Sequence, residues 1–137
     1  MNKAIILAAG EGTRMKSNIS KVLHKIVNKT LLEYVLEASL DAGIQDNIVI
    51  VGRNEEKVKE YFGPDLIYRR QNIGKDYPYG TGYAVKQAVD LIGDEDSILI
   101  LSGDVPLIKG ETLKNLLDFH NEAGNSATVL TADIDDP

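Results

Sequence analysis

Cysteine is absent from this chain of 137 residues, and only two histidines are present. The protein therefore has neither disulfide bonds nor thiolate metal sites, and two histidines are too few for a histidine-rich metal site. Its apolar runs are far shorter than the ~18 residues that a membrane-spanning helix needs. Residues 1–3 lead directly into a strand-like pattern, with no signal-peptide pattern. We therefore expect a cytoplasmic protein that does not bind membranes.

Positive charge is also scarce, because 21 acidic residues outnumber 15 basic ones and the formal net charge is −6. Binding of a nucleic-acid polymer usually needs a basic face, so this balance argues against DNA or RNA as a partner. A small phosphorylated ligand is compatible with it, since a few local cations can hold one phosphate chain within an acidic protein. The length is sufficient for one domain.

Continuous apolar runs and helical periods alternate along the chain. The runs at residues 4–7, 48–51 and 98–101 predict strands covered on both faces, as in a parallel sheet. Apolar stripes with helical spacing lie at 32–40, 84–92 and 113–120, a shorter helix is predicted at 55–62, and weaker strand patterns lie at 66–68 and 127–130. Thr30 and Gly43 are candidates for the start and stop of the first helix.

This alternation predicts an α/β fold, Rossmann-like and doubly wound around a mainly parallel sheet. In such folds, ligands bind beyond the carboxyl ends of the strands. Three segments should therefore meet: the loop after Leu7, the segment around Gly80, and Asp104 after the third apolar run. The sequence runs out after a strand-like stretch at 126–132 with no closing element. That pattern favours an incomplete domain, and the alternative is a small complete domain with a frayed tail.

The loop after the first strand contains Gly10 and Gly12 and leads to the cations Arg14 and Lys21. Glycines allow the backbone to approach phosphate oxygens closely. The spacing is not that of a dinucleotide fingerprint, because Met15 stands where the third glycine is expected, and it is not that of a P-loop. Phosphate binding is the hypothesis. The alternatives are a strand-to-helix turn without a ligand and, for the two cations, ordinary solvated surface.

Other polar residues carry weaker indications. Asp104 should face the ligand crevice, where Mg²⁺ commonly takes one or two protein carboxylates, unless it simply caps the next turn. Thr81 could cap a helix beside glycines that let a flat nucleobase approach the backbone, or it could belong to a plain turn. We interpret His24 and His120 as structural because both accompany apolar positions. The sequence offers no Ser/His/Asp triad.

Three separated blocks, taken in order, form a more specific pattern. They are Leu7-Ala8-Ala9-Gly10-Glu11-Gly12-Thr13-Arg14-Met15-Lys16-Ser17 with Lys21-Val22-Leu23-His24, then Gly80-Thr81-Gly82-Tyr83-Ala84, then Gly103-Asp104-Val105-Pro106-Leu107. This pattern resembles the sugar-1-phosphate nucleotidyltransferase family. The stretches at 15–17 and 21–24 favour its N-acetylglucosamine-1-phosphate uridylyltransferase branch, bacterial bifunctional enzymes with an N-terminal transferase (pyrophosphorylase) domain. The similarity covers essentially the whole chain but only the first part of that domain, so residues 1–137 are expected to be its N-terminal, nucleotide-binding part.

The resemblance implies a fold of the nucleotide-diphospho-sugar transferase type and a function in making cell-wall (peptidoglycan) precursors. The reaction would be Mg²⁺-dependent transfer of a uridylyl group from UTP to N-acetylglucosamine-1-phosphate, giving UDP-N-acetylglucosamine and pyrophosphate. By position, it implies that Leu7, Ala8, Ala9, Gly10, Gly12 and Thr13 contact the nucleotide, that Arg14 and Lys21 are catalytic and hold its phosphates, that Gln71, Gly80 and Thr81 read the uracil, and that Asp104 ligates Mg²⁺.

The chain departs from the family at several positions. Ser20 stands where proline usually precedes the motif lysine, and Gln71 lies farther before Gly80 than the family's glutamine does, which leaves its role open. Tyr83 and Ser102 replace the usual histidine and tyrosine. These changes leave base and sugar specificity open. The resemblance places the family's sugar-contacting residues, its second metal ligand and its acetyltransferase β-helix after residue 137.

Two alternatives to this function are therefore kept. One is a non-catalytic nucleotide-binding module, either as a fragment or as a regulatory relative. The other is a nucleotidyltransferase for a different sugar phosphate or base. The sequence does not determine whether the full-length protein is a homo-oligomer.

Overall fold

The sheet at the centre of the molecule is parallel, as the apolar runs predict. The computed structural model describes residues 1–10, 20–78 and 80–131, and in these residues four strands form the order β5-β4-β1-β6. The strands are β1 (Asn2–Leu7), β4 (Asp46–Val51), β5 (Ile67–Arg70) and β6 (Ser97–Ser102), and β2 (Lys25–Ile26) pairs with β3 (Lys29–Thr30) as a separate antiparallel ribbon. The three strongest strand predictions are confirmed, and the pattern at 66–68 corresponds to β5, which begins one residue later and ends two residues later.

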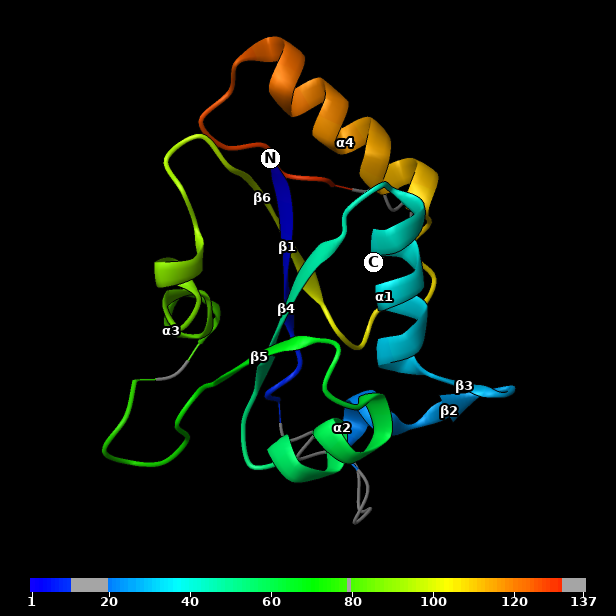
Figure 1. The fold of residues 1–137 in the computed structure, drawn as a ribbon, viewed down its shortest axis with the longest axis vertical. Coiled ribbons are helices and arrows are strands. Elements are labelled where there is room, and N and C mark those ends of the chain that lie inside the picture. The colour runs from blue at the N-terminus through cyan, green and yellow to red at the C-terminus, as the bar shows by residue number, and fades with distance from the viewer. Residues whose placement is uncertain (11–19, 79, 132–137) are drawn as a thin grey trace, which may run out of the picture.

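Helices cover both faces of this sheet. They are α1 (Leu31–Asp41), α2 (Glu55–Phe62), α3 (Thr81–Lys86) and α4 (Gly110–Ala123), with short 3₁₀ turns η1 (Lys21–Leu23) and η2 (Val89–Leu91). Figure 1 shows α1 and α4 on one side of the sheet and α3 on the other. Because the four strands are parallel, their carboxyl ends lie at one edge of the sheet.

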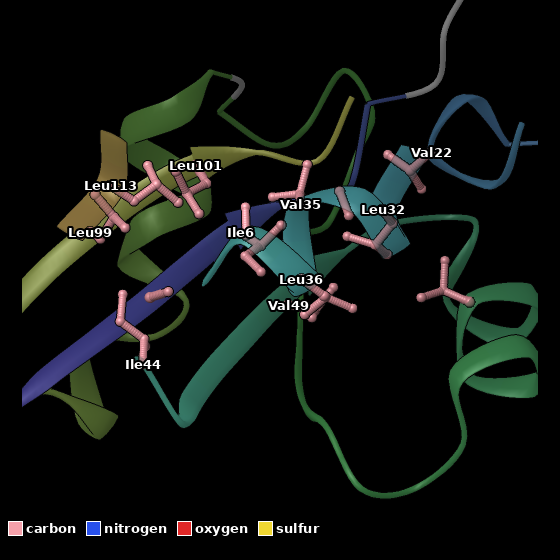
Figure 2. Packing of buried hydrophobic residues seen from close by; sticks show 14 of the residues in the cluster. Ile6, Val22, Leu32, Val35, Leu36, Ile44, Val49, Leu99, Leu101 and Leu113 are labelled. Atoms are coloured by element: carbon pink, nitrogen blue, oxygen red, sulfur yellow. The ribbon is translucent and has the colours of Figure 1, made fainter. Parts of the chain in front are cut away.

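The two buried faces follow the alternation of side chains along β1. Ile6 packs into the larger apolar cluster, which includes Leu32 and Val35 of α1 and Leu113 of α4, while Ile5 packs into the smaller one against α3. Figure 2 shows the larger cluster between the strands and α1. Because both faces of the sheet are covered, residues 4–7 of β1 are all apolar, and this explains the continuous run in the sequence.

Local sequence explains how the first helix begins and ends. The Thr30 hydroxyl accepts a hydrogen bond from the Glu33 amide at 3.1 Å, and the Glu33 carboxylate accepts one from the Thr30 amide at 2.8 Å. This reciprocal capping box satisfies two of the amides that a helix start leaves unpaired. Gly43 adopts φ 88°, a left-handed conformation that ends the helix without the strain a side chain would cause. Both predicted ends are confirmed.

Three details of the predicted elements are wrong. The helix predicted at 84–92 is shorter and earlier, since α3 ends at Lys86 and only a 3₁₀ turn follows, with Val89 57% exposed. Thr81 does not cap α3, because Gly80 holds the cap position and no side-chain cap bond is made. Leu40, assigned to the apolar stripe of α1, is 55% exposed. At Val89 and Leu40 the predicted helical period extends past the surface that the sheet offers for burial.

The strand predicted at 127–130 is also wrong. Residues 125–131 have no regular structure, and Val129 and Leu130 are 79% and 50% exposed. Apolar residues favour a strand only where a neighbouring strand and a buried face are available, and the described part of the chain offers neither at this position. In the same described part, no helix is long and apolar enough to cross a membrane.

Candidate functional site

The carboxyl ends of β1 and β6 lie side by side, since Leu7 is the register partner of Ser102. From β1 the chain moves outward to β4 and β5 and then returns to β6 on the opposite side of β1. Such a reversal of strand order leaves a crevice beyond the strand ends. A cavity of about 410 Å³ lies there, and its lining includes the predicted site residues Leu7, Ala9, Gly10, Lys21, Gln71, Gly80, Thr81 and Asp104. The three segments that the sequence predicted to meet do meet.

Some predicted residues are placed differently. Ala8 does not line the cavity; its side chain is buried in the larger apolar cluster, and its amide donates to the Ile50 carbonyl at 2.9 Å. The contact of the Ala8 backbone with a nucleotide, which the resemblance implies, stays a prediction. Gly12, Thr13 and Arg14 lie outside the described residues.

Close packing of backbone shapes the inner wall of the cavity. The Gly103 amide donates to the Leu7 carbonyl at 2.9 Å, and a Cβ on Gly103 would lie 3.0 Å from that oxygen and 3.3 Å from a Val22 methyl group. A side chain there would push β6 away from the start of the glycine loop. Glycine at position 103 thus keeps Asp104, the next residue, close to the loop.

Lys21 and Asp104 form an ion pair across the cavity mouth. The Lys21 Nζ and Asp104 Oδ2 atoms lie 2.8 Å apart, and the side chains are 42% and 33% exposed. The sequence assigned the lysine to phosphates and the aspartate to a metal, and it did not predict that each would face the other. The aspartate does not cap the following helix, since α4 has Lys109 at its cap position. Both groups are accessible, so an anion can engage the lysine and a cation the aspartate.

The donor set is compatible with Mg²⁺. Asp104 supplies the one carboxylate among the described lining residues, and no three His, Asp or Glu side chains cluster elsewhere in the described part to form a metal cage. Mg²⁺ commonly takes one or two protein carboxylates and completes its shell with water and phosphate oxygens. One hard oxygen donor at this cavity is compatible with that ion.

Gln71 reaches the site despite its unusual spacing. Its amide continues the pairing of β5 with the Val51 carbonyl at 2.7 Å, and its side chain is only 9% exposed. The Gln71 Nε2 atom lies 3.5 Å from the Gly80 carbonyl oxygen, at the outer limit of a hydrogen bond. The longer spacing in the sequence therefore still allows Gln71 to lie beside Gly80. Gly80 adopts φ 109°, a conformation that favours glycine.

Most of the remaining wall is apolar. Ala9, Val22, Ile73 and Ala84 line it, three of them are buried, and Ser102 adds one hydroxyl group. An apolar slot with a few polar groups is the usual composition of a small-molecule site, and its volume lies in the common range. Sequence reasoning missed Ile73, because one apolar residue within a polar loop carries no periodic pattern.

Both histidines lie away from the chemistry of the cavity. His120 of α4 is half-buried, and its Nδ1 atom lies 2.9 Å from the Thr128 hydroxyl, a contact that ties the end of α4 to the segment after it. His24 is half-buried beside η1, and its carbonyl accepts from the Leu31 amide at 2.9 Å. Neither lines the cavity, which is consistent with structural roles.

Comparison with known proteins gives one family and a consistent set of relatives. The sequence model of the MobA-like NTP transferase domain matches residues 4–136. The chain is 46% identical over 135 residues to the bifunctional protein GlmU of Clostridioides difficile and 44% identical over 133 residues to that of Thermoanaerobacter pseudethanolicus. The matches cover 98% and 97% of this chain but only 28% of either relative.

Solved structures agree with the fold. A nucleotidyl transferase from Methanothermobacter superposes with a TM-score of 0.72 at 26% identity, over 86% of this chain and 57% of that one. A UDP-glucose pyrophosphorylase complexed with UDP-glucose gives 0.69 at 25% identity, over 90% and 54%. Rv0371C of Mycobacterium tuberculosis, in complex with manganese, gives 0.70 at 19% identity, over 89% and 60%, and this last match supports the fold alone.

Proposed function

The chain belongs to the family of MobA-like NTP transferase domains, and from that premise we propose that it forms the nucleotide-binding part of a uridylyltransferase. The complete protein would transfer a uridylyl group from UTP to N-acetylglucosamine-1-phosphate, releasing pyrophosphate. The observation that carries the proposal is the cavity at the ends of β1 and β6, where a cation, a carboxylate and an apolar slot meet. The motif resemblance supplies the identity of the sugar, and the UDP-glucose-bound relative supports a uridine nucleotide.

The proposed roles follow from the position of each residue. The backbone from Leu7 to Gly10 lies against the nucleotide, Lys21 binds its phosphates, and Gln71 with Gly80 faces the base. The apolar wall accommodates a flat base, and the cavity volume of about 410 Å³ is of the size used for small ligands. Arg14 is proposed as a second phosphate ligand on the resemblance alone.

The reaction needs positioning and charge neutralisation. An oxygen of the sugar phosphate attacks the α-phosphorus of UTP, the bond from that phosphorus to the bridging oxygen breaks, and pyrophosphate leaves with the electron pair. No protein nucleophile takes part. Lys21 stabilises the negative charge that accumulates on the phosphates, as preorganised charges do at such centres. Mg²⁺ held by Asp104 would supply further neutralisation of the phosphate oxygens.

The chain covers only part of the length of its relatives, and this limits the activity expected of it. It spans 28% of the two GlmU relatives and 54% to 60% of the three solved neighbours. We propose that these 137 residues alone bind UTP and turn it over little, because the residues that contact the sugar phosphate are assigned by the resemblance to a later part of the domain. Robust pyrophosphate release by this chain alone, with UTP and the sugar phosphate, would contradict this part of the proposal.

Titration calorimetry with UTP, CTP, ATP and GTP in the presence of Mg²⁺ tests the nucleotide assignment. UTP is expected to bind most tightly, and equal binding of all four nucleotides would overturn the uracil assignment. Replacing the base-facing glutamine, Gln71→Ala, should reduce the preference for UTP over CTP. Gln87→Ala is a matched control, since the Gln87 side chain also donates to a backbone carbonyl, that of Tyr83 at 2.8 Å, but does not line the cavity.

A further inference from the structure

Asn54 precedes α2 at the position where an asparagine ordinarily caps a helix, yet its side chain caps nothing there. Its amide makes three other contacts. The Oδ1 atom accepts from the Gly52 amide at 3.0 Å, and the Nδ2 atom donates to the Ala8 carbonyl at 2.8 Å and to the Ser20 hydroxyl at 2.8 Å. The side chain is thus directed away from its own helix and toward the glycine loop.

The two Nδ2 bonds join the start of that loop to its end. Ala8 directly follows β1, and its amide is fixed to the Ile50 carbonyl of β4 at 2.9 Å, so this end belongs to the rigid sheet. Ser20 directly precedes Lys21, and its carbonyl accepts from the Leu23 amide at 2.9 Å, so this end belongs to the η1 turn. Asn54 therefore links the η1 turn to the sheet through these two hydrogen bonds.

The backbone of Ser20 shows what this hydrogen bond maintains. Ser20 adopts φ −53° and ψ 140°, within the φ range that a proline ring imposes covalently. Serine has no ring to hold it in this region, and in this conformation its hydroxyl accepts the bond from Asn54. The hydrogen bond from Asn54 thus accompanies a conformation that a proline ring would impose covalently.

We propose that Asn54 is a positioning residue, which clamps Ala8 to Ser20 and thereby sets Lys21 against the phosphates of a nucleoside triphosphate. This inference rests on the proposed function for the identity of the ligand. Asn54 itself does not line the cavity. Its effect should therefore appear in the binding of phosphates and not in the binding of the base.

The test compares UTP with uridine, which lacks phosphates, as ligands of the 137-residue chain in the presence of Mg²⁺. Asn54→Ala removes all three of these hydrogen bonds and should weaken UTP binding about tenfold, while uridine binding changes less than about twofold. Ser20→Ala should weaken UTP binding by about threefold, since Asn54 keeps its bond to Ala8. The double variant should be no weaker than Asn54→Ala, because the Ser20 hydroxyl has no Asn54 donor in either protein.

The chain offers a matched control and a rescue. The Ser97 hydroxyl donates to Asn121 Oδ1 at 2.6 Å, an exposed serine–asparagine pair between β6 and α4, and Asn121→Ala should leave the ratio of UTP to uridine affinity unchanged. Ser20→Pro added to Asn54→Ala should restore much of the UTP affinity, because the ring substitutes for the missing hydrogen bond. Ser20→Thr, which keeps the hydroxyl, should bind UTP like the wild type.

The outcomes separate the two proposals. If the wild-type chain does not bind UTP, the proposed function fails and the inference fails with it. If the wild type binds UTP but Asn54→Ala and Ser20→Ala weaken UTP and uridine equally or not at all, the clamp alone is overturned, since a general loss of structure affects both ligands. Should Asn54→Ala not fold, Ser20→Ala against Ser20→Thr decides the question, because only the second variant keeps the hydroxyl.

Discussion

Two lysine–aspartate pairs lie at opposite edges of the same sheet. Lys3 and Asp96 meet at the amino edge, where β1 and β6 begin, and Lys21 and Asp104 meet at the carboxyl edge, where those strands have ended. The nitrogen-to-oxygen distance is 2.8 Å in both pairs. By residue type and distance they are the same interaction.

Their surroundings differ. At the amino edge, Lys3 also donates to the Leu91 carbonyl at 2.8 Å, Asp96 also accepts from the Gly93 amide at 2.7 Å, and the two side chains are 19% and 11% exposed. At the carboxyl edge, the side chains are 42% and 33% exposed and border a cavity. The first pair is surrounded by further partners, and the second leaves room for a ligand. The environment of a pair, more than its length, distinguishes a structural contact from a binding group.

Of the substitutions that test this contrast, the largest effect is expected from the loss of Lys21 on ligand binding at the carboxyl edge. Lys21→Ala should weaken UTP binding by about 10- to 100-fold, or ~1.4–2.7 kcal/mol, because the variant lacks a charged donor to the phosphates. Titration calorimetry of the variant measures this directly. The thermal midpoint should change little, since the pair is solvent-exposed.

Lys25→Ala is the matched control for that variant. It removes the same charge from an exposed lysine a few residues away that does not line the cavity. UTP affinity should stay within about twofold of the wild type, a difference near the limit at which binding free energies are distinguished. An equal loss in both variants would mean that net charge, and not the position of Lys21, governs binding.

At the amino edge, loss of the lysine should change the stability of the fold and not the binding of a ligand. Lys3→Met keeps the apolar stem but removes the bonds to Asp96 and Leu91, and it should lower the free energy of unfolding by about 1–2 kcal/mol. Urea denaturation checks the loss. UTP affinity should be unchanged, and a variant with weaker affinity as well would show that the two edges are coupled through β1.

This contrast also shows where prediction from the sequence succeeded. Periodicity identified β1, β4, β6, α1, α2 and α4, because burial on a sheet imposes a repeat that neighbouring residues share. The rule that parallel strands end at one edge then predicted that Leu7, Gly80 and Asp104 meet. Asp96, by contrast, lies in a short acidic stretch outside any periodic pattern, and nothing in the sequence predicts its bond to Lys3.

Contacts between residues that are distant in sequence leave no local pattern, and for this reason the sequence did not predict the hydrogen bonds of Asn54. Asn54 bonds to Ala8 and Ser20, which are 46 and 34 residues away in sequence, and no local pattern encodes such a pairing. The pairing of β1 with β4 brings Asn54, which follows β4, near Ala8, which follows β1. Ser20 departs from the family's proline, and this departure acquires a physical meaning once its φ of −53° and its partner are known.

Acid should weaken the amino-edge pair in a defined pH window. The bond from Lys3, the Gly93 amide and the nearby charges lower the pKa of Asp96 below its ordinary value of 3.8. Because the folded pKa is the lower one, the stabilisation is complete well above pH 3.8 and is lost as the pH falls through the folded value. The difference in unfolding free energy between the wild type and Asp96→Asn should be constant near neutral pH and shrink below about pH 4. A difference that stayed constant down to about pH 2 would argue against this ionic contribution.

The smallest effect should be the contribution of the Lys21–Asp104 pair to folding. An exposed pair gains little from attraction, since water screens it and both side chains lose freedom. In a double-mutant cycle of Lys21→Ala and Asp104→Ala without ligand, we expect a coupling energy below about 0.5 kcal/mol in urea unfolding. A coupling as large as the loss expected for Lys3→Met would mean that the carboxyl-edge pair is structural after all. Then the cost of separating Lys21 from Asp104 would oppose the engagement of either group by a nucleotide or a cation. A near-zero coupling leaves both groups ready to exchange partners, as the proposed binding requires.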